Sequence, residues 1–279
     1  MNGVQAAILG VIQGLAEFLP VSSSGHLILG AEVLGLPSPG LSFSVLVHLG
    51  TALATIVMLH DEIFWIIRGV LAPSDRDHRA RAFGIVGLLF AATIPGALVA
   101  VFAGDYIDRA FSSPIVAAVG LCVTSVVLYG TRESRRGCRR DRGYTFEREM
   151  LSSVDLGRAL NVGLAQAVAV TPGISRSGMT IAAGLHSGMS REDAARFSFL
   201  LALPAVLGGA LLDYLNAAAA GASMFTTEGL IGAASAFVSG LFALSVVFRA
   251  VRKGSLSRYA YYCFIAGVSS LIWLLTWKR

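Results

Sequence analysis

Residues 13–26 form the stretch QGLAEFLPVSSSGH, and residues 166–178 form the stretch QAVAVTPGISRSG. Each stretch interrupts a longer apolar segment, residues 2–36 for the first and residues 157–189 for the second. The apolar pieces on either side of each break are shorter than the roughly 20 residues that a helix needs to cross a bilayer. Irregular backbone at membrane depth is tolerated only where it is buried in protein or lines a watery cavity. Each segment is therefore predicted to be a re-entrant hairpin of two half-helices.

The composition of the whole chain is that of a membrane protein. Its 279 residues are 55% hydrophobic and 14% charged, with a mean hydropathy of +0.70, whereas soluble domains contain about 25% charged residues. This composition argues against a soluble globular protein and excludes a disordered, collagen-like or coiled-coil protein. Six further stretches of about 20 apolar residues are predicted to span the membrane: Leu41–His60, Ala82–Ala103, Ala110–Thr131, Phe197–Ala222, Gly229–Phe248 and Tyr259–Trp277. The predicted fold is an all-α polytopic membrane protein, with six transmembrane helices and two re-entrant helical hairpins.

The two broken segments also form an internal repeat. A shift of 153 residues aligns polar and glycine positions of the first segment with those of the second: Gly10 with Gly163, Gln13 with Gln166, Ser22 with Ser175, Ser24 with Ser177, Gly25 with Gly178 and Gly35 with Gly188. Chance similarity between apolar stretches is the alternative, but the shared polar positions favour duplication. Three spans separate the copies, so the repeat is predicted to be inverted, within one membrane domain over residues 1–279. Repeat 1 covers about 2–131 and repeat 2 about 157–277, with a charged loop over 132–158.

The positions of the cations predict an orientation in the bilayer. On this topology, 18 of the 22 Lys and Arg residues lie in the loops at 61–81, 131–158, 190–196 and 249–258. Because positive loops stay in the cytoplasm, these loops are predicted to be cytoplasmic, with both termini outside. The cations behind the net charge of +5 are thus explained by the orientation of the protein in the membrane. A nucleic-acid partner is not expected.

The predicted site lies where the two hairpins meet, near the middle of the membrane. The half-helices after the two serine-rich breaks would direct their N-termini at this point, and such ends bind anions, above all phosphate. Arg176 is the sharpest candidate, because an arginine at membrane depth is costly and its planar fork suits phosphate oxygens. A structural ion pair with Glu17 is the alternative role for Arg176.

Three further side chains of the first break could carry chemistry. Glu17 could serve as a general base, orient a hydroxyl or hold a divalent ion. Ser23 and His26 are three residues apart and can share one face of the half-helix. Each serine alone is more often a helix cap than a nucleophile. The prediction of a nucleophile therefore depends on Ser23 occurring together with His26, Glu17 and the opposed Arg176. His48 lies inside a predicted span, where a packed, hydrogen-bonded imidazole is the more frequent role.

These motifs resemble one family over nearly the whole chain. Gln13-x-x-x-Glu17 with Pro20-Val21-Ser22-Ser23-Ser24-Gly25-His26, paired with Pro172–Thr180 and the stretch Phe197–Pro204, resembles the undecaprenyl-diphosphate phosphatase family, the integral membrane bacitracin-resistance proteins. The resemblance implies hydrolysis of undecaprenyl diphosphate to undecaprenyl phosphate, which recycles the lipid carrier of cell-wall synthesis. It also implies the bacterial plasma (inner) membrane, with a site open to the periplasmic side.

The resemblance assigns expected roles to individual residues. Ser23 would be the nucleophile, with Glu17 and His26 assisting. Arg176 would clamp the diphosphate, together with the residues around both half-helix starts: Ser22, Ser24, Gly25, Ser175, Ser177, Gly178 and Thr180. Gln13 and Gln166 would be supporting residues.

The family is also described as dependent on a divalent cation such as Mg²⁺. Gln13 stands at a position where the family allows Glu or Gln, which leaves Glu17 as the one carboxylate of the motif. The ion would therefore be bound mainly by the oxygens of the diphosphate. The expected partners are the polyprenyl diphosphate lipid and the bilayer, and the sequence does not predict an oligomeric state. The competing function is a transporter or flippase for an anionic lipid or a small anion, because inverted repeats of broken helices also build transporters.

Overall fold

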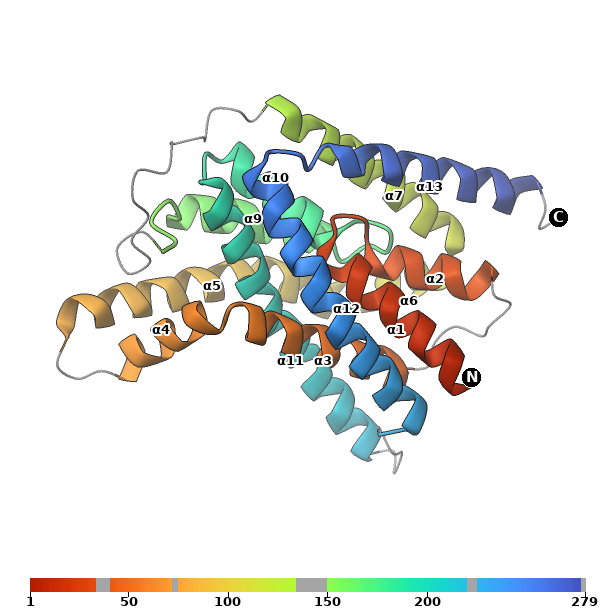
Figure 1. The fold of residues 1–279 in the computed structure, drawn as a ribbon, viewed down its shortest axis with the longest axis horizontal. Helices are drawn as coiled ribbons and strands as arrows, with labels where there is room; N and C mark the ends of the chain where they lie inside the picture. The colour runs from red at the N-terminus through yellow and green to blue at the C-terminus, as the bar shows by residue number, and fades with distance from the viewer. Residues whose placement is uncertain (34–40, 72–74, 134–149, 220–224, 277–279) are drawn as a thin grey trace.

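The structure is a computed structural model that describes residues 1–33, 41–71, 75–133, 150–219 and 225–276. Over these residues the regular elements are helices (Figure 1), so the all-α prediction is confirmed. They are α1 (Gly3–Phe18), α2 (Ser23–Val33), α3 (Leu41–Met58), α4 (His60–Leu71), α5 (Arg76–Phe102), α6 (Gly104–Phe111), α7 (Pro114–Gly130), the 3-10 turn η1 (Thr131–Glu133), α9 (Leu156–Val168), α10 (Arg176–His186), α11 (Arg191–Ala219), α12 (Thr227–Arg252) and α13 (Arg258–Thr276).

Four of these helices, α5, α11, α12 and α13, are each long and apolar enough to cross a membrane. Two further pairs reach that length together, but each pair is bent, α3 with α4 by 77° and α6 with α7 by 96°. The described residues thus provide four to six candidate spans, which lie on the six predicted stretches. The chain is a multi-pass membrane protein.

The segment at 61–81 was predicted to be a loop, and this prediction is wrong over most of its length. Residues 61–71 belong to α4, and α5 already begins at Arg76. The charges of α4 suit a helix, because Asp61 and Glu62 lie in its first turn and Arg68 in its last, where they complement the helix dipole. The charged residues that signalled a loop thus belong to the two ends of α4 and to the start of α5.

The span predicted over Ala110–Thr131 begins later than expected. Ala110 belongs to the short helix α6, and α7 begins at Pro114. The Ser113 side chain caps α7 by accepting a hydrogen bond from the backbone N–H of Val116 at 3.4 Å. Proline at the first position of a helix needs no hydrogen-bond acceptor for a backbone N–H. The Ser-Pro pair therefore ends one helix and starts the next at a sharp angle.

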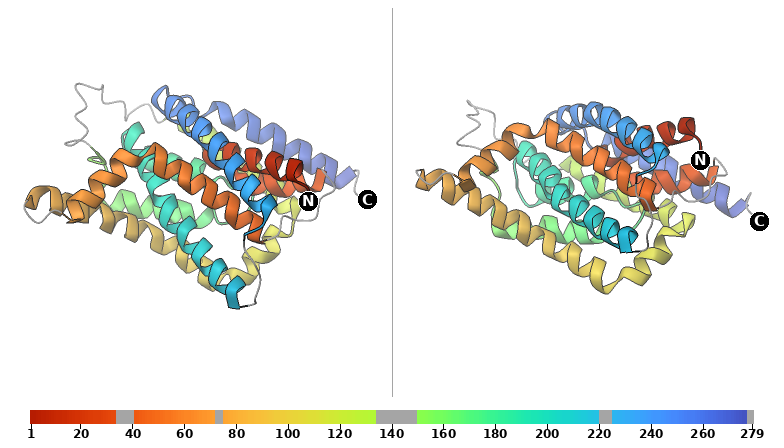
Figure 2. Two further views of the ribbon diagram at one scale, coloured as in Figure 1. Left: turned by 60° about the horizontal axis from the view of Figure 1, so that its bottom comes forward. Right: turned by 90° about the horizontal axis from the view of Figure 1, so that it is seen from below.

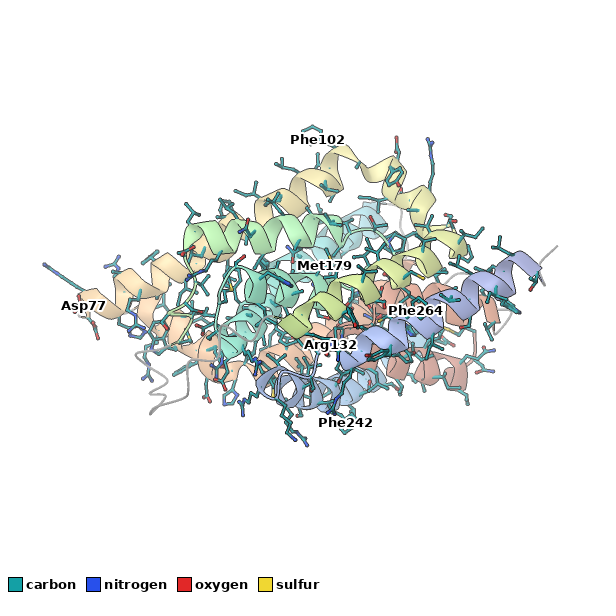
Figure 3. The ribbon with its side chains drawn as sticks, turned by 90° about the horizontal axis from the view of Figure 1, so that it is seen from above. Asp77, Phe102, Arg132, Met179, Phe242 and Phe264 are labelled. Atoms are coloured by element: carbon teal, nitrogen blue, oxygen red, sulfur yellow. The ribbon has the colours of Figure 1, made fainter. Side chains whose placement is uncertain are left out.

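Large apolar side chains cover the outside of the bundle. Phe102 is 83% exposed and Phe242 is 63% exposed, and both project from the helices (Figure 3). Such a surface is unfavourable in water but is matched by lipid tails, which are as apolar as the side chains themselves. The exposed apolar surface therefore agrees with a bilayer environment.

The helices of each half of the chain pack on the broken segment of the other half. In the first broken segment, α1 lies along α12, and the backbone of Gly10 approaches Gly232 so closely that a side chain would not fit. In the second, α9 lies along α5, with Gly163 against the backbone of Ala92 in the same way. Gly10 and Gly163 are equivalent positions of the repeat. The two views of Figure 2 show this interlocked arrangement.

The second break is held by a glycine that no other residue can replace without strain. Gly173 has φ +86°, and a Cβ there would lie 2.9 Å from the Cα of Ala117 on α7. A non-glycine residue in this left-handed conformation costs about 1–2 kcal/mol, before any steric overlap. The close contact lets α7 support the break.

We expect Gly173→Ala to lower the unfolding temperature of the protein in detergent and to reduce its activity, because both strain and overlap oppose the native break. Gly30→Ala is the matched control, since nothing lies within 4 Å of a Cβ at Gly30 and alanine favours a helix. Equal unfolding temperatures for the two variants would contradict this account of Gly173.

Candidate active site

The two breaks end in the same cap. In the first, the Ser22 Oγ accepts a hydrogen bond from the backbone N–H of Gly25 at 3.3 Å, and α2 begins at Ser23. In the second, the Ser175 Oγ accepts from the N–H of Gly178 at 3.1 Å, and α10 begins at Arg176. These capping serines, one from each break, occupy equivalent positions of the repeat.

A second contact repeats in the same way. The hydroxyl of Ser22 lies 3.3 Å from that of Ser24, and the hydroxyl of Ser175 lies 3.3 Å from that of Ser177. The predicted caps therefore form as expected, and they place Ser23 and Arg176 at the same position of their helices.

Ser23 and Arg176 converge on one carboxylate. The Ser23 hydroxyl donates to Glu17 Oε2 at 2.5 Å, and the Arg176 Nη2 donates to Glu17 Oε1. Gln13 also donates its Nε2 to Oε2, at 3.0 Å. Glu17 is only 9% exposed, so this carboxylate at the end of α1 joins the starts of α2 and α10 inside the protein.

Backbone contacts bring the two breaks together beside this carboxylate. The Ser177 hydroxyl donates to the Leu19 carbonyl at 3.4 Å. On the α7 side, Thr124 accepts from the N–H of Ser175 at 2.9 Å and donates to the Gly173 carbonyl at 3.1 Å. The meeting point predicted from the repeat is thus built by direct contacts.

His26 lies beside the site but points away from its carboxylate. Its Nδ1 is 2.8 Å from the Ser22 carbonyl, and its Nε2 is 2.7 Å from the Tyr262 hydroxyl of α13. The two rings also stack, with centroids 5.6 Å apart. Among the described residues, neither Ser23 nor Glu17 is bonded to His26. The structure therefore gives Ser23 a carboxylate partner and ties His26 to α13.

The remaining predicted residues lie around this centre. The Thr180 hydroxyl is fully buried. It bonds to the Arg176 carbonyl at 2.7 Å and to the Ser198 hydroxyl at 2.5 Å, which connects α10 to α11. Gln166 is buried, and its Oε1 has no hydrogen-bond partner in the described part of the chain. The Oε1 of its equivalent, Gln13, is unpartnered in the same way.

The arrangement combines an anion site with a proton acceptor. Two helix N-termini and a guanidinium supply positive charge and N–H donors. A guanidinium has five N–H donors, and the Arg176 side chain is recorded with one acceptor, Glu17, in the described residues. The Ser23 hydroxyl already donates to a carboxylate, which is the arrangement that activates a hydroxyl nucleophile.

A cluster of protein ligands for a metal ion is not formed by the described residues, since no three His, Cys, Asp or Glu side chains come together there. The buried, unpartnered Oε1 of Gln13 is nevertheless an oxygen of the kind that Mg²⁺ binds, next to the Glu17 carboxylate. These two residues fit an ion that takes most of its ligands from a bound diphosphate.

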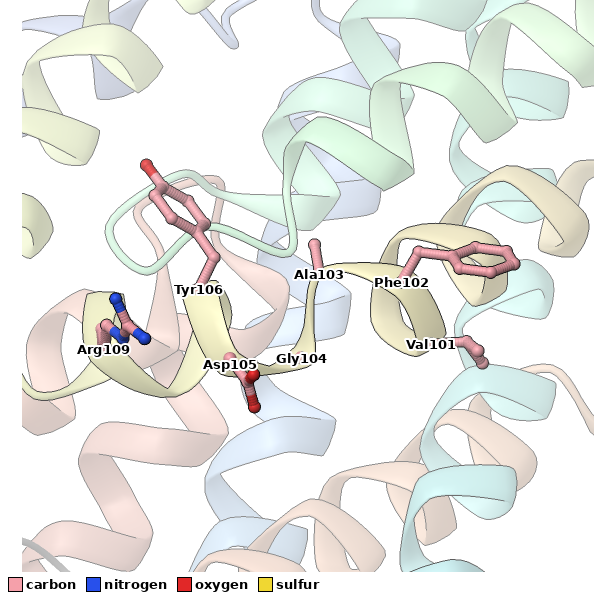
Figure 4. A pocket seen from close by; sticks show the side chains of 7 residues that line it. All are labelled: Val101, Phe102, Ala103, Gly104, Asp105, Tyr106 and Arg109. Carbon is pink, nitrogen blue, oxygen red and sulfur yellow. The ribbon is translucent and has the colours of Figure 1, made fainter.

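A separate hollow of about 430 Å³ lies at the corner between α5 and α6 (Figure 4). Tyr106, Asp105 and Arg109 contribute its polar side chains. None of the residues lining it belongs to the cluster around Glu17. The candidate active site therefore rests on the convergence of side chains and not on this hollow.

Two neighbours of the site were not predicted from the sequence as parts of it. Tyr262 is 236 residues from His26, and nothing in the spacing of either motif indicates this contact. His48 of α3 has its Nε2 3.9 Å from Glu17 Oε2. The position of His48 inside an apolar span could have indicated a place in the site. The sequence analysis favoured a packed, hydrogen-bonded imidazole instead.

Comparison with known proteins places the chain in a family. A family model described as "Bacitracin resistance protein BacA" matches residues 6–269. A protein of Desulforapulum autotrophicum is 39% identical over 98% of both chains, and one of Korarchaeum cryptofilum is 38% identical over 97% of this chain and 99% of its own. A protein of Bacteroides thetaiotaomicron is 37% identical over 98% and 99%. All three are named undecaprenyl-diphosphatase. The chain belongs to the BacA family of bacitracin resistance proteins.

Proposed function

We propose that this protein is a phosphatase that hydrolyses undecaprenyl diphosphate to undecaprenyl phosphate and inorganic phosphate. One observation carries the proposal: Ser23 and Arg176, from two different broken segments, meet on the buried carboxylate of Glu17. The printed names of the relatives agree with this chemistry. Recycling of the lipid carrier for cell-wall synthesis, and resistance to bacitracin, follow from this activity and from the family.

The proposed binding step uses the positive side of the site. The unused N–H groups of Arg176 and the starts of α2 and α10 hold the diphosphate oxygens, with the hydroxyls of Ser22, Ser24, Ser175 and Ser177 close by. Phosphoryl transfer needs mainly positioning and neutralisation of charge. The polyprenyl tail stays in the lipid outside the helices.

The proposed chemical step begins with the Ser23 hydroxyl. Its proton passes to Glu17 Oε2 while Oγ forms a bond to the terminal phosphorus, and the anhydride bond breaks to release undecaprenyl phosphate. Glu17 then passes this proton to an oxygen of the departing undecaprenyl phosphate. Water next attacks the phosphorus of the phosphoserine: Glu17 accepts a proton from the water and returns it to Ser23 Oγ as the Oγ–P bond breaks and inorganic phosphate is released. Direct attack by a water that Ser23 orients is the alternative, and the 2.5 Å hydrogen bond between Ser23 and Glu17 favours the serine. His26, bonded to Tyr262, keeps the start of α2 in place.

We further propose that a divalent cation such as Mg²⁺ assists the reaction. Gln13 Oε1 and Glu17 would hold it together with the substrate oxygens, and when bound it would neutralise charge on the diphosphate. The buried, unpartnered Oε1 of Gln13 supports this assignment.

The membrane arrangement proposed here is one domain over residues 1–279, with six spans and two re-entrant hairpins in an inverted repeat. Repeat 1 covers about 2–131 and repeat 2 about 157–277. The matching serine caps and the matching packing of Gly10 and Gly163 support the duplication.

The orientation follows from the ends of the helices. The start of α1 and the end of α13 lie at one end of the molecule, and the end of α4 and the start of α5 lie at the opposite end (Figures 1 and 2). We propose that the α4–α5 end, together with the loop at 132–158, faces the cytoplasm, since arginines concentrate there. The site then opens to the periplasmic side of the plasma (inner) membrane.

A transporter of an anionic polyprenyl lipid is a second candidate function, because two broken helical segments meet inside the bundle as they do in many transporters. A transporter has no need of a serine hydroxyl bonded to a carboxylate, and it releases no phosphate in detergent. The phosphatase is therefore the better-supported function.

Purified protein in detergent is expected to release inorganic phosphate from undecaprenyl diphosphate, and to release less after treatment with EDTA. Activity should return when Mg²⁺ is added back, because the ion would neutralise charge on the bound diphosphate. Absence of phosphate release at every Mg²⁺ concentration would refute the phosphatase and favour the transporter. Full activity in EDTA would refute only the role of the cation.

A further inference from the structure

The backbone of the first break is strained at Ser22. Ser22 has φ +71°, a left-handed conformation that is unfavourable for a residue with a side chain. Its equivalent in the second break, Ser175, forms the same cap with φ −73°. The left-handed residue of the second break is instead Gly173, and glycine adopts this conformation freely. A strained residue persists only where its surroundings hold it, so the first break needs a support that the second does not.

A chain of contacts runs from α13 to this strained residue. The Ser22 carbonyl accepts a hydrogen bond from the backbone N–H of His26 at 3.2 Å and another from its Nδ1 at 2.8 Å. The other ring nitrogen, Nε2, lies 2.7 Å from the Tyr262 hydroxyl, and the two rings stack with an interplanar angle of 10°. Whichever atom donates in the contact between Nε2 and the hydroxyl, the imidazole connects Tyr262 to the backbone of Ser22.

The support of the first break by α13 has a counterpart in the second break. There α7, which packs along α13, supplies Thr124 to accept a hydrogen bond from the N–H of Ser175 at 2.9 Å. Next to Tyr262, α13 adds a second contact, because the Cys263 Sγ donates to the Pro20 carbonyl at 3.5 Å. Each break is thus held by polar contacts from a helix of the opposite half of the chain.

We propose that Tyr262 is a positioning residue for the reaction, which acts through His26 to hold Ser22 in its left-handed conformation. In this way it keeps the hydroxyl of Ser23, the next residue, directed at Glu17. The inference rests on the proposed function, in which Ser23 is the nucleophile. If Ser22 relaxed to a negative φ, the peptide that leads into Ser23 would turn and carry the hydroxyl away from the carboxylate.

The first test removes the hydroxyl of Tyr262 and keeps its ring. Tyr262→Phe retains the stack with His26 but loses the contact with Nε2. We expect kcat for undecaprenyl diphosphate to fall about tenfold, since relief of the strain at Ser22 competes with the active arrangement. KM should change little, because Arg176 still binds the diphosphate and only the transition state is affected.

Tyr261→Phe is the matched control. Tyr261 is the neighbouring residue of α13, and its hydroxyl accepts a hydrogen bond from Arg132 at 3.4 Å, away from both breaks. Removal of this hydroxyl is therefore expected to leave kcat and KM unchanged.

The second test asks whether the effect of Tyr262 passes through the strain at Ser22. Glycine takes a left-handed conformation without strain, and it replaces a serine cap at small cost. Ser22→Gly therefore no longer needs the support of α13, and kcat of Ser22→Gly/Tyr262→Phe should equal that of Ser22→Gly alone. A tyrosine that only stabilised the fold would lower the unfolding temperature and leave kcat of the folded protein unchanged.

The outcomes separate this inference from the function on which it rests. An active wild-type protein in which Tyr262→Phe and Tyr261→Phe have the same kcat would overturn the role of Tyr262 and leave the phosphatase standing. The same loss of kcat on Tyr262→Phe with and without Ser22→Gly would also overturn it, because the effect would then not pass through Ser22. Wild-type protein that releases no phosphate would overturn the phosphatase, and this inference with it.

Discussion

Replacing Arg176 with alanine is expected to reduce phosphate release by about 10³-fold or more, the range lost when an arginine that stabilises a transferring phosphoryl group is removed. The change removes the guanidinium from both of its proposed partners, the diphosphate and Glu17. We therefore expect the affinity for a polyprenyl diphosphate to fall as well as the turnover. Arg176→Lys should recover only a small part of either, because an ammonium keeps the charge but not the planar fork.

A purely structural ion pair between Arg176 and Glu17 would also make Arg176→Ala harmful, and a second variant separates the two explanations. Removing the arginine leaves a buried carboxylate without its guanidinium partner, which should lower the unfolding temperature. The double variant Glu17→Gln/Arg176→Ala has no unpaired charge, so it should recover stability. If Arg176 is the clamp, this stable protein still fails to bind diphosphate.

Controls for this comparison are available in the chain. Arg249 is an exposed arginine in the last turn of α12, and Arg249→Ala should leave activity unchanged. Glu17→Gln alone should bind diphosphate without turning it over. Normal diphosphate affinity in the stable double variant would contradict the clamp and leave only the structural ion pair.

The residues that the sequence predicted best are those whose role follows from local chemistry. Serines after a proline break predict helix caps, and Ser22 and Ser175 form them. The ion pair with Glu17 was the alternative role expected for Arg176, and the structure contains this pair. Both predictions hold because a polar group inside a membrane has few ways to be satisfied.

Predictions that relied on charge alone were weaker. The residues between 61 and 81 are charged enough to suggest a loop, yet Glu62 is buried and accepts a hydrogen bond from Arg196 of α11 at 2.9 Å. In the sequence, charged residues that pair across helices cannot be told from solvated ones. Arg196 is 134 positions from Glu62, and no local pattern reveals that the two residues pair.

The sequence named two possible partners for the Ser23 hydroxyl, His26 and Glu17, and could not decide between them for a related reason. Ser23 lies three positions from His26 and six from Glu17, and helical spacing favours the histidine. The break at Pro20 folds the chain back, which brings Ser23 onto Glu17 and directs His26 to Tyr262. The geometry of the break, and not the helical period, decides which side chains meet.

Replacing Ser23 with alanine is expected to have the second large effect, a loss of about 10⁴-fold or more in turnover, as for other activated nucleophiles. Binding should survive, because the diphosphate is held by Arg176 and the helix starts. Arg176→Ala differs from Ser23→Ala in this respect, because it is expected to lose both turnover and binding. Ser24→Ala should lose far less turnover than Ser23→Ala, since the Ser24 hydroxyl contacts only the neighbouring Ser22 among the described hydrogen bonds.

Ser235 of α12 supplies a control for the removal of a hydroxyl from a membrane helix. Its hydroxyl bonds to the carbonyl of Ile231 within the same helix, so Ser235→Ala should retain full activity. If Ser23→Ala keeps a tenth or more of the wild-type turnover, serine is not the nucleophile. The carboxylate would then activate water directly, and Glu17→Gln would remain inactive while Ser23→Ala did not. Trapping a phosphoserine at Ser23 in the wild-type protein would decide for the covalent route, because only that route transfers the terminal phosphate to the protein.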